Sequence, residues 1–291
     1  MKRFFDPKLM LITAMSIFGT IGLFVRYIPL PSGEIALYRA ILASILLFIF
    51  IAITKYPIRL KEIKKEALLL FISGAAMGFN WILLFEAYKY TTVSIATLSY
   101  YFAPVIVTVA CPILFKEKMS NRQWLCFIMS TLGIVLITGF DPGSGGNHLI
   151  GVLLGLGAAC LYASVVLLNK YIKNTPDVHR TLLQFIAAAV VLIPYTILTD
   201  GVNILSLNTR GWILLLTVGL IHTGITYCMY FSALRSLSGQ QTAILSYIDP
   251  LVAVLISVFV LGENMSVIQI IGGSLILGFT LYNELPSKNQ R

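Results

Sequence analysis

The sequence predicts an all-α integral membrane protein with ten transmembrane helices, arranged as two inverted five-helix repeats. Three observations lead to this prediction: an apolar composition, long uncharged runs with short connections, and a segment that recurs without its positive charges. Of the 291 residues, 58% are hydrophobic and only 11% are charged. Soluble domains carry about a quarter charged residues. The composition therefore indicates a chain that resides in lipid.

Ten apolar runs are long enough to cross a bilayer, because ~20 mostly apolar residues span ~30 Å of hydrocarbon. The first run follows Lys2, Arg3 and Lys8 and is too long for a secretory signal, so we expect it to remain as the first helix. The short connections leave no room for an ATPase or another soluble domain. The predicted spans are 9–29, 33–54, 67–88, 92–114, 123–140, 150–170, 180–198, 211–232, 238–261 and 267–283.

Positive residues gather in alternate connections. With the N-terminus in the cytoplasm, most of the Lys and Arg side chains fall on the inner side, and only Arg26, Lys89 and Arg210 lie near the outer side. Positive residues near short loops stay cytoplasmic. We therefore expect a multi-pass protein of the cell membrane with both termini in the cytoplasm. The formal charge of +9 reflects this topology and gives no reason to expect nucleic acid.

The segment FKEKMSNRQ at 115–123 recurs as LGENMSVIQ at 261–269, an offset of 146 residues. The same ungapped offset pairs Tyr101 with Tyr247 and Pro104 with Pro250, among others. Each half holds five spans, an odd number, so corresponding segments cross the bilayer in opposite directions. The first copy is then cytoplasmic and keeps its positive charges, whereas the second is outside and lacks them. The predicted organisation is a first repeat at 1–140, a linker at 141–149, a second repeat at 150–283 and a cytoplasmic tail at 284–291.

Inverted halves can rock about a site at the bilayer midplane and expose it to each side in turn. This favours a secondary transporter, while a channel, or a bundle that is only a membrane scaffold, stays as an alternative. The four cysteines lie inside spans without paired spacing, and no nucleophile–base pair or catalytic motif is present. We therefore expect no enzyme activity, no catalytic residue, no metal and no cofactor.

Two sets of residues resemble the EamA domains of the drug/metabolite transporter superfamily. They are Tyr101-Phe102-Ala103-Pro104 with 116–120, and Tyr247-Ile248-Asp249-Pro250 with 261–273. Arg39 is similar to that family's arginine early in the second helix. The resemblance covers nearly the whole chain, and it implies a ten-helix bundle around a central cavity that exports or exchanges amino acids and related small metabolites. Larger or drug-like solutes, nucleosides or vitamins are the alternative, and monomer and homo-oligomer both stay open.

Polar side chains in mid-span are costly in lipid, so we expect them to face a cavity or a partner helix. Asp249 lies near the centre of its span beside Pro250, whose ring removes a backbone hydrogen bond. His222, Thr226 and Tyr230 form a stripe at helical spacing in the preceding span. His222 and Asp249 are predicted to form a proton-sensitive couple or a clamp for an ammonium or carboxylate group, or else a plain helix-to-helix hydrogen bond.

Aromatic rings beside a few polar groups suit a small zwitterion with an apolar side chain. Packing of the core is the alternative for Trp81 and Tyr101. Arg39 needs a partner in the membrane, and Glu34 and Asp249 are the predicted counter-ions. We assign Arg39, Pro104 and Pro250 to structural or coupling roles. The predicted cavity residues are Asn80, Trp81, Tyr100, Tyr101, Tyr162, His222, Thr226, Tyr227, Ser246, Tyr247 and Asp249.

Overall fold

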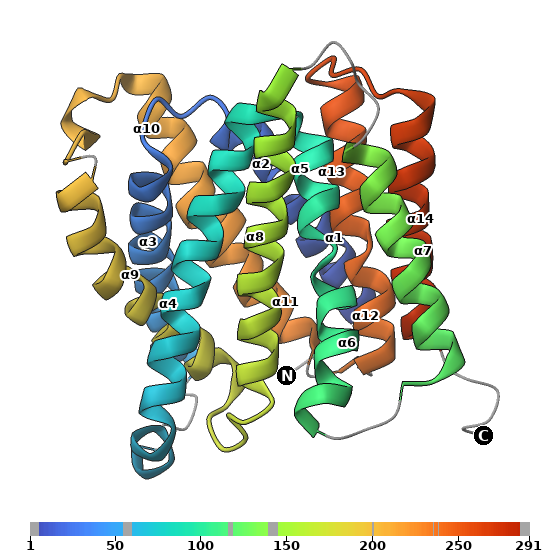
Figure 1. Cartoon of the computed structure of the whole chain (residues 1–291). Coiled ribbons are helices and arrows are strands. Elements are labelled where there is room, and N and C mark those ends of the chain that lie inside the picture. The colour runs from blue at the N-terminus through green and yellow to red at the C-terminus, as the bar shows by residue number, and fades with distance from the viewer. Residues whose placement is uncertain are drawn as a thin grey trace.

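The protein is a bundle of helices, seen here in a computed structural model that describes residues 6–54, 60–115, 119–138, 145–199, 201–234, 236–237 and 239–285 (Figure 1). Within these ranges every regular element is helical. Eight of the described helices or helix pairs have the length and hydropathy to cross a membrane, and 244–259 is a shorter apolar helix. Together with α7 (Asn121–Thr138), they are consistent with the ten predicted helices.

The described helices divide into two halves. The first half contains α1 (Pro7–Gly19), α2 (Ile21–Val25), α3 (Ser32–Thr54), α4 (Leu60–Tyr90), α5 (Val93–Tyr100), α6 (Ala103–Phe115) and α7. The second contains α8 (Gly145–Asn169), α9 (Asp177–Thr199), η1 (Ile204–Ser206), α10 (Thr209–Leu216), η2 (Thr217–Ile225), α11 (Thr226–Leu234), α12 (Gly239–Ser246), α13 (Ile248–Phe259) and α14 (Val267–Glu284).

The two halves run in opposite directions. In Figure 1, α1 begins and α14 ends at the lower face, which we call the terminal face, whereas α7 ends and α8 begins at the upper, distal face. α6 ends and α7 begins at the terminal face, whereas α13 ends and α14 begins at the distal face. The predicted inverted repeat is therefore confirmed. Residues 116–118, residues 141–144 of the predicted linker and residues 286–291 of the predicted tail lie outside the described residues.

The repeated motif has a local role that is the same in both copies. Ser266 and Gln269 form a capping box at the start of α14, in which each side chain bonds the other's backbone N–H. At the start of α7, Ser120 Oγ accepts from the Gln123 N–H at 3.2 Å, and Gln123 Oε1 accepts from the Ser120 N–H at 2.8 Å. Such boxes satisfy N–H groups that a helix start leaves free. The Ser and Gln of the motif are thus explained as helix caps, whereas its Glu is not.

Two predicted spans are broken at matching points. The helix break between α5 and α6 is at Tyr101 and Phe102, and the break between α12 and α13 is at Tyr247. Pro104 and Pro250 follow these breaks, lack an N–H and crowd the carbonyl four residues earlier, so each helix changes direction there. The span predicted at 9–29 is also broken, at Thr20 between α1 and α2.

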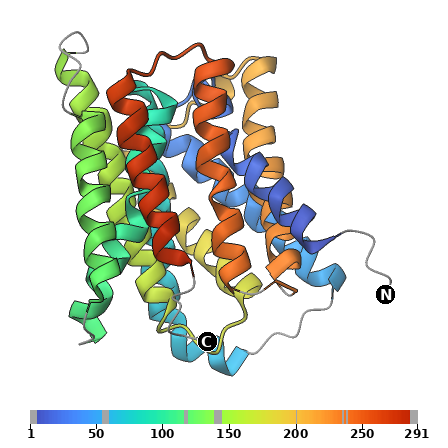
Figure 2. The ribbon, with the colours of Figure 1, turned by 90° about the vertical axis from the view of Figure 1, so that its right-hand side faces the viewer.

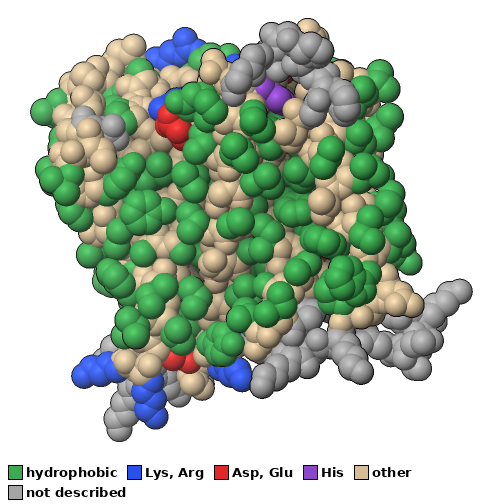
Figure 3. Space-filling view, in the orientation of Figure 1, with side chains coloured by type: hydrophobic (Ala, Val, Ile, Leu, Met, Phe, Trp, Pro, Cys, Tyr) green, Lys and Arg blue, Asp and Glu red, His purple; other side chains and the backbone are tan. Residues whose placement is uncertain are grey.

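The outer surface of the bundle is apolar at mid-height. Figure 3 shows hydrophobic side chains across the middle of the molecule and Lys and Arg side chains near its two ends. Large apolar side chains that are more than half exposed include Phe48, Ile53, Leu68 and Ile113. A broad apolar surface of this kind is matched to lipid rather than to water. The chain is accordingly a multi-pass membrane protein.

Glycines bring α7 and α14 into close contact, as Figure 2 shows. A Cβ added at Gly272 would lie 2.7 Å from the carbonyl oxygen of Gly133, and one added at Gly133 would lie 2.6 Å from that of Gly272. Small residues let membrane helices approach in this way. The pair therefore fixes the spacing of one helix from each half.

We expect Gly272→Ala to destabilise the protein by about 1–3 kcal/mol, because a backbone carbonyl cannot move aside for the new methyl group. Gly278→Ala on the same helix is the matched control, since no atom lies within 4 Å of a Cβ there. Ala also favours a helix over Gly by about 1 kcal/mol, so the control should be neutral or stabilising. Thermal unfolding in detergent measures both, and equal melting temperatures would contradict the close contact.

Candidate functional site

Five tyrosines meet inside the bundle at the level of the helix breaks. Ring centroids of Tyr100 lie 5.7 Å from Tyr101 and 5.4 Å from Tyr162, and those of Tyr227 and Tyr230 are 6.4 Å apart. Tyr100, Tyr227 and Tyr230 pack against the same cluster of buried core residues, which brings the two groups together. Tyr162 is 39% exposed and the other four residues are half-buried, so none of the five is fully enclosed by protein. We call these five residues the tyrosine cluster.

Asp249 lies at the edge of the tyrosine cluster. The Tyr101 hydroxyl donates a hydrogen bond to Asp249 Oδ2. Asp249 belongs to the first turn of α13, where the free N–H groups of the helix start favour a negative charge. The break before Pro250 thus places this helix start, with its carboxylate, inside the bundle. Asp249 is also near enough to Arg39 for their opposite charges to attract.

Arg39 is buried on α3 and has aromatic and hydroxyl partners. Its Nε donates to Thr223 Oγ1 at 2.6 Å, and its guanidinium carbon lies 4.3 Å from the centroid of the Trp81 ring and 5.6 Å from that of Phe85. The prediction of an ion pair with Glu34 is wrong, because both Glu34 oxygens accept from the Asn203 N–H at 3.0 Å. Arg39 is held mainly by cation–π contact and one hydrogen bond.

His222 does not form the predicted couple with Asp249. Its Nε2 lies 2.9 Å from Thr20 Oγ1, at the break between α1 and α2, and its Nδ1 lies 3.2 Å from the Thr217 carbonyl oxygen. The ring also packs on Phe24, with centroids 4.6 Å apart. Both ring nitrogens therefore have partners other than Asp249, and His222 joins the eighth span to the first.

The eighth span contains a π-helix, η2, that spacing in the sequence does not reveal. Thr223 Oγ1 donates to the Val218 carbonyl at 2.9 Å, and Thr226 Oγ1 donates to the Ile221 carbonyl at 2.7 Å, each five residues back. The predicted stripe assumed an α-helix, so it misplaced Thr226, whose side chain is fully buried. Segments of π-helix are frequent at functional sites. Here it turns Thr223 toward Arg39.

The remaining predicted residues mainly hold helices together. Asn80 donates from Nδ2 to the Ala158 carbonyl at 2.6 Å and so links α4 to α8. Trp81 packs between Arg39 and Phe185, whose ring centroid is 5.4 Å away. Ser246 donates back to the Thr242 carbonyl at 2.8 Å. Tyr247 is buried at its helix break.

The set of predicted cavity residues did not include two aromatic residues beside the tyrosine cluster. Phe18 and Phe185 contact the Tyr227 ring edge-on, with centroids 5.1 and 5.2 Å away. Tyr230, though part of the predicted stripe, was not assigned to the cavity either. The sequence signal that could have found them is their position at mid-span, at the depth of the helix breaks.

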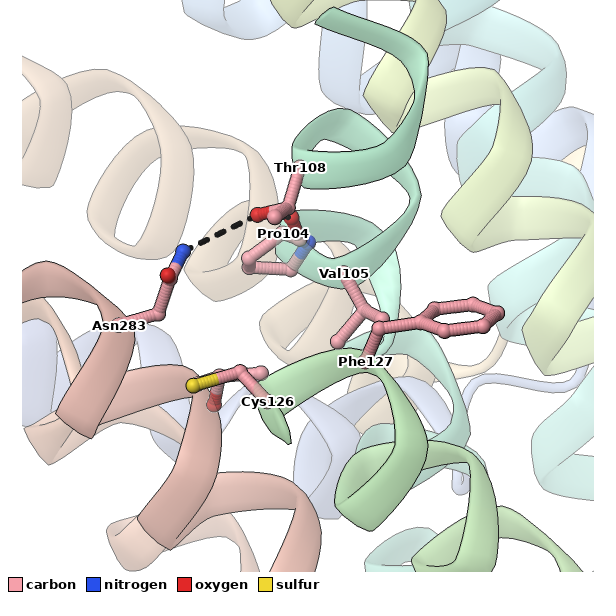
Figure 4. A pocket seen from close by; sticks show the side chains of 7 residues that line it. Pro104, Val105, Thr108, Cys126, Phe127 and Asn283 are labelled. Carbon is pink, nitrogen blue, oxygen red and sulfur yellow. Dashed lines mark hydrogen bonds between the residues drawn. The ribbon is translucent and has the colours of Figure 1, made fainter. Parts of the chain in front are cut away.

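Two pockets lie outside the tyrosine cluster. Figure 4 shows a pocket between α6, α7 and α14, in which Asn283 Nδ2 donates to Thr108 Oγ1 at 3.1 Å. Its volume of about 10 Å³ holds about one water molecule, which is too small for a metabolite. A larger pocket, of about 240 Å³, lies at the distal face beside α2, α3 and α4. Phe85 contributes to its wall and also contacts Arg39.

Two oppositely directed halves with helices broken at mid-height define the class of membrane transporters built from inverted repeats. The chain matches the EamA-like transporter family over residues 8–139 and 149–283, and it belongs to that family. Sequence comparisons also find similar proteins whose names support a membrane transporter role.

The relatives include the uncharacterized transporter YxxF of Bacillus subtilis (strain 168), which is 32% identical over 265 residues covering 90% of this chain and 84% of the relative. An uncharacterized transporter of Archaeoglobus fulgidus is 25% identical over 267 residues, 90% of each chain. A solved crystal structure aligns with a TM-score of 0.64 and 18% identity over 94% of this chain and 95% of that one, which shows the fold alone. The named relatives are transporters rather than enzymes.

Proposed function

We propose that the protein is a secondary transporter that exports small metabolites, such as amino acids and their derivatives, by alternating access of a central site. The observation that carries this proposal is the combination of Asp249, Arg39 and the half-buried tyrosine cluster in the middle of the bundle. A negative and a positive side chain inside a membrane bundle indicate a solute pathway, because such charges are costly there.

This arrangement suits a zwitterion. An ammonium group would be attracted by the Asp249 carboxylate and by the faces of the tyrosine rings, and a carboxylate would be attracted by the Arg39 guanidinium. The rings offer contact area to an apolar side chain, and their hydroxyls can bond to polar groups. Larger or drug-like solutes, nucleosides and vitamins are the alternative substrates that the same rings would accept.

We further propose that the protein lies in the cell membrane with its terminal face in the cytoplasm. Described positive residues at that face include Lys64, Lys65, Lys170 and Lys173. The distal face has few, and two of them pair with carboxylates, Arg26 with Glu263 and Lys89 with Glu86. A positive terminal face and a neutralised distal face support this orientation.

The test uses purified protein in proteoliposomes and a panel of amino acids, nucleosides and cationic drugs. We expect counterflow of a zwitterionic solute, since a carrier exchanges solutes and a channel does not drive counterflow. No flux or counterflow for any zwitterion, with drug or nucleoside flux instead, would overturn the proposed substrate class. No flux at all would favour a scaffold.

Asp249→Asn should lower the transport rate at least tenfold at sub-saturating solute, because interactions of a charged group with its partner are worth roughly 1.5–3 kcal/mol. Asp177→Asn is the control, since Asp177 is 57% exposed at the terminal face and pairs within its own helix with Arg180. Transport by Asp249→Asn that equals the wild-type rate at every pH would remove Asp249 from the site.

A further inference from the structure

The distal half of the bundle encloses α5 completely. Residues 93–99 are all buried, so protein surrounds this helix on every side. In α6, by contrast, residues 106–111 are all half-buried, so neither its outer nor its inner side is fully covered. The tyrosine cluster lies where these two helices meet. Packing is therefore tight around α5, between the cluster and the distal face, and looser around α6, toward the terminal face.

One carboxylate joins the segments that close the distal side. Glu263, in the connection from α13 to α14, forms an ion pair with Arg26 at the end of α2. It also accepts from the Val93 N–H at 2.9 Å, at the start of α5, and from Ser257 Oγ of α13. The Glu263 side chain is 7% exposed. A single acidic side chain thus holds two segments of the first half against the second half.

A pair of serines extends this contact. Ser257 Oγ lies 2.9 Å from Ser94 Oγ and accepts from the Ser94 N–H at 3.2 Å. Negative charge at a helix start is favourable, and the first N–H groups of α5 have no partner within their own helix. Glu263 and Ser257 supply those partners from the opposite half. Separation of α5 from α13 would part the Glu263 carboxylate from these N–H groups and expose both to water.

We propose that Glu263 is the positioning residue of a distal gate, whose contacts with Arg26, Val93 and Ser257 keep the tyrosine cluster closed to the distal face and break when the cluster opens to it. The proposal rests on the proposed alternating access. It explains the Glu of the second copy of the motif, the part of that copy that helix capping leaves unexplained. The contacts of the Glu263 carboxylate then depend on the face to which the tyrosine cluster is open. They do more than hold the helices against one another.

The test measures access to the tyrosine cluster from each face. In a chain whose four native cysteines are replaced by alanine, Tyr162→Cys is labelled with a membrane-impermeant maleimide in sealed vesicles of both orientations. Leu205→Cys, at a side chain that is 89% exposed in η1 of the distal face, identifies the preparation that presents that face. Neither the topology prediction nor a known solute is needed for this measurement.

We expect Glu263→Gln to raise the labelling rate of Tyr162→Cys from the distal face at least tenfold. Loss of a contact worth about 1.4 kcal/mol shifts a two-state equilibrium by that factor. Glu86→Gln is the matched control, a carboxylate of the same face that pairs with Lys89 in its own helix and with Ser32. With Glu86→Gln, Tyr162→Cys should be labelled at the same rate as in the chain that keeps both Glu86 and Glu263.

Equal distal labelling in Glu263→Gln and Glu86→Gln would overturn the gate. If Glu263→Gln does not fold, the same labelling is measured in Arg26→Gln. This variant removes the ion pair alone, and Arg26 is 39% exposed, so the fold should tolerate it. Its labelling should rise in the same direction, and an unchanged rate would equally overturn the proposal. If labelling rises as expected while the solute panel shows no flux, the gate stands and the proposed substrate fails.

Discussion

A disulfide between Ser94→Cys and Ser257→Cys should stop transport, and reduction should restore it. The two hydroxyl oxygens lie 2.9 Å apart, on α5 of one half and α13 of the other, so cysteine sulfurs at the same positions point at one another, as an S–S bond of about 2.05 Å requires. The bond would hold the distal gate closed, so the tyrosine cluster could exchange solute with the terminal face alone. Counterflow in proteoliposomes before and after oxidation measures the effect.

Each single variant is the control for the pair. Ser94→Cys and Ser257→Cys, in the background without native cysteines, should transport at equal rates with and without oxidant, since neither can cross-link alone. Mass spectrometry of the intact protein confirms that the pair has formed its bond. Undiminished counterflow by fully cross-linked protein would show that α5 and α13 need not separate at this point during transport.

Arg39→Met should also lower the rate of transport strongly. Arg39 is 5% exposed, stacks on Trp81 and donates to Thr223, so the guanidinium has a fixed position in the bundle. A hydrogen bond to a charged group is worth roughly 1.5–3 kcal/mol, so we expect transport of a carboxylate-bearing solute to fall about 10- to 100-fold. Arg39→Lys keeps the charge without the planar fork and should give an intermediate rate.

The matched control for Arg39 is Arg210→Met. Arg210 is exposed at the distal face and also approaches an aromatic ring, with its guanidinium carbon 5.5 Å from the centroid of Tyr27. Removal of the Arg210 guanidinium should leave the rate of transport close to that of the wild type. A purely structural role for Arg39 would lower transport of amines without a carboxylate as much as that of amino acids. Equal losses for both solute types would contradict a carboxylate contact.

The architecture could be predicted from the sequence because it depends on properties summed over many residues, such as hydropathy and the spacing of the repeat. Apolar runs set the helices, and the 146-residue offset with an odd number of spans per half set their opposite directions. Pro250 indicated a disturbed helix, since a proline ring removes a hydrogen bond of its own backbone, and Pro104 was assigned a structural or coupling role. The structure places a helix break just before each of them.

The partners of buried polar groups could not be predicted in the same way. Arg39 pairs with Thr223 rather than Glu34, and His222 with Thr20 rather than Asp249. Both contacts join helices far apart in the sequence, so they depend on how each helix is rotated about its axis. The π-helix adds to this rotation in the eighth span, and spacing counted as an α-helix carries no sign of it.

Glycines are the one sequence signal that marks the π-helix region in retrospect. A Cβ at Gly219 would meet Leu42 of α3 and one at Gly224 would meet Leu46, both closer than 2.5 Å to a side-chain carbon. The two glycines therefore allow α3 and its Arg39 to approach η2. A glycine pair alone indicates close packing without naming the helix that it meets, which is why Thr223 was not recognised as a partner.

Reaction of a single cysteine at Tyr162 from each face of the membrane tests the central claim most directly. A site shared by two inverted halves should react to completion from either face, in sealed vesicles of each orientation, and faster from the terminal face because the distal gate is closed. A cysteine that reacts from one face only, from neither, or at the same rate from both would contradict alternating access around the tyrosine cluster.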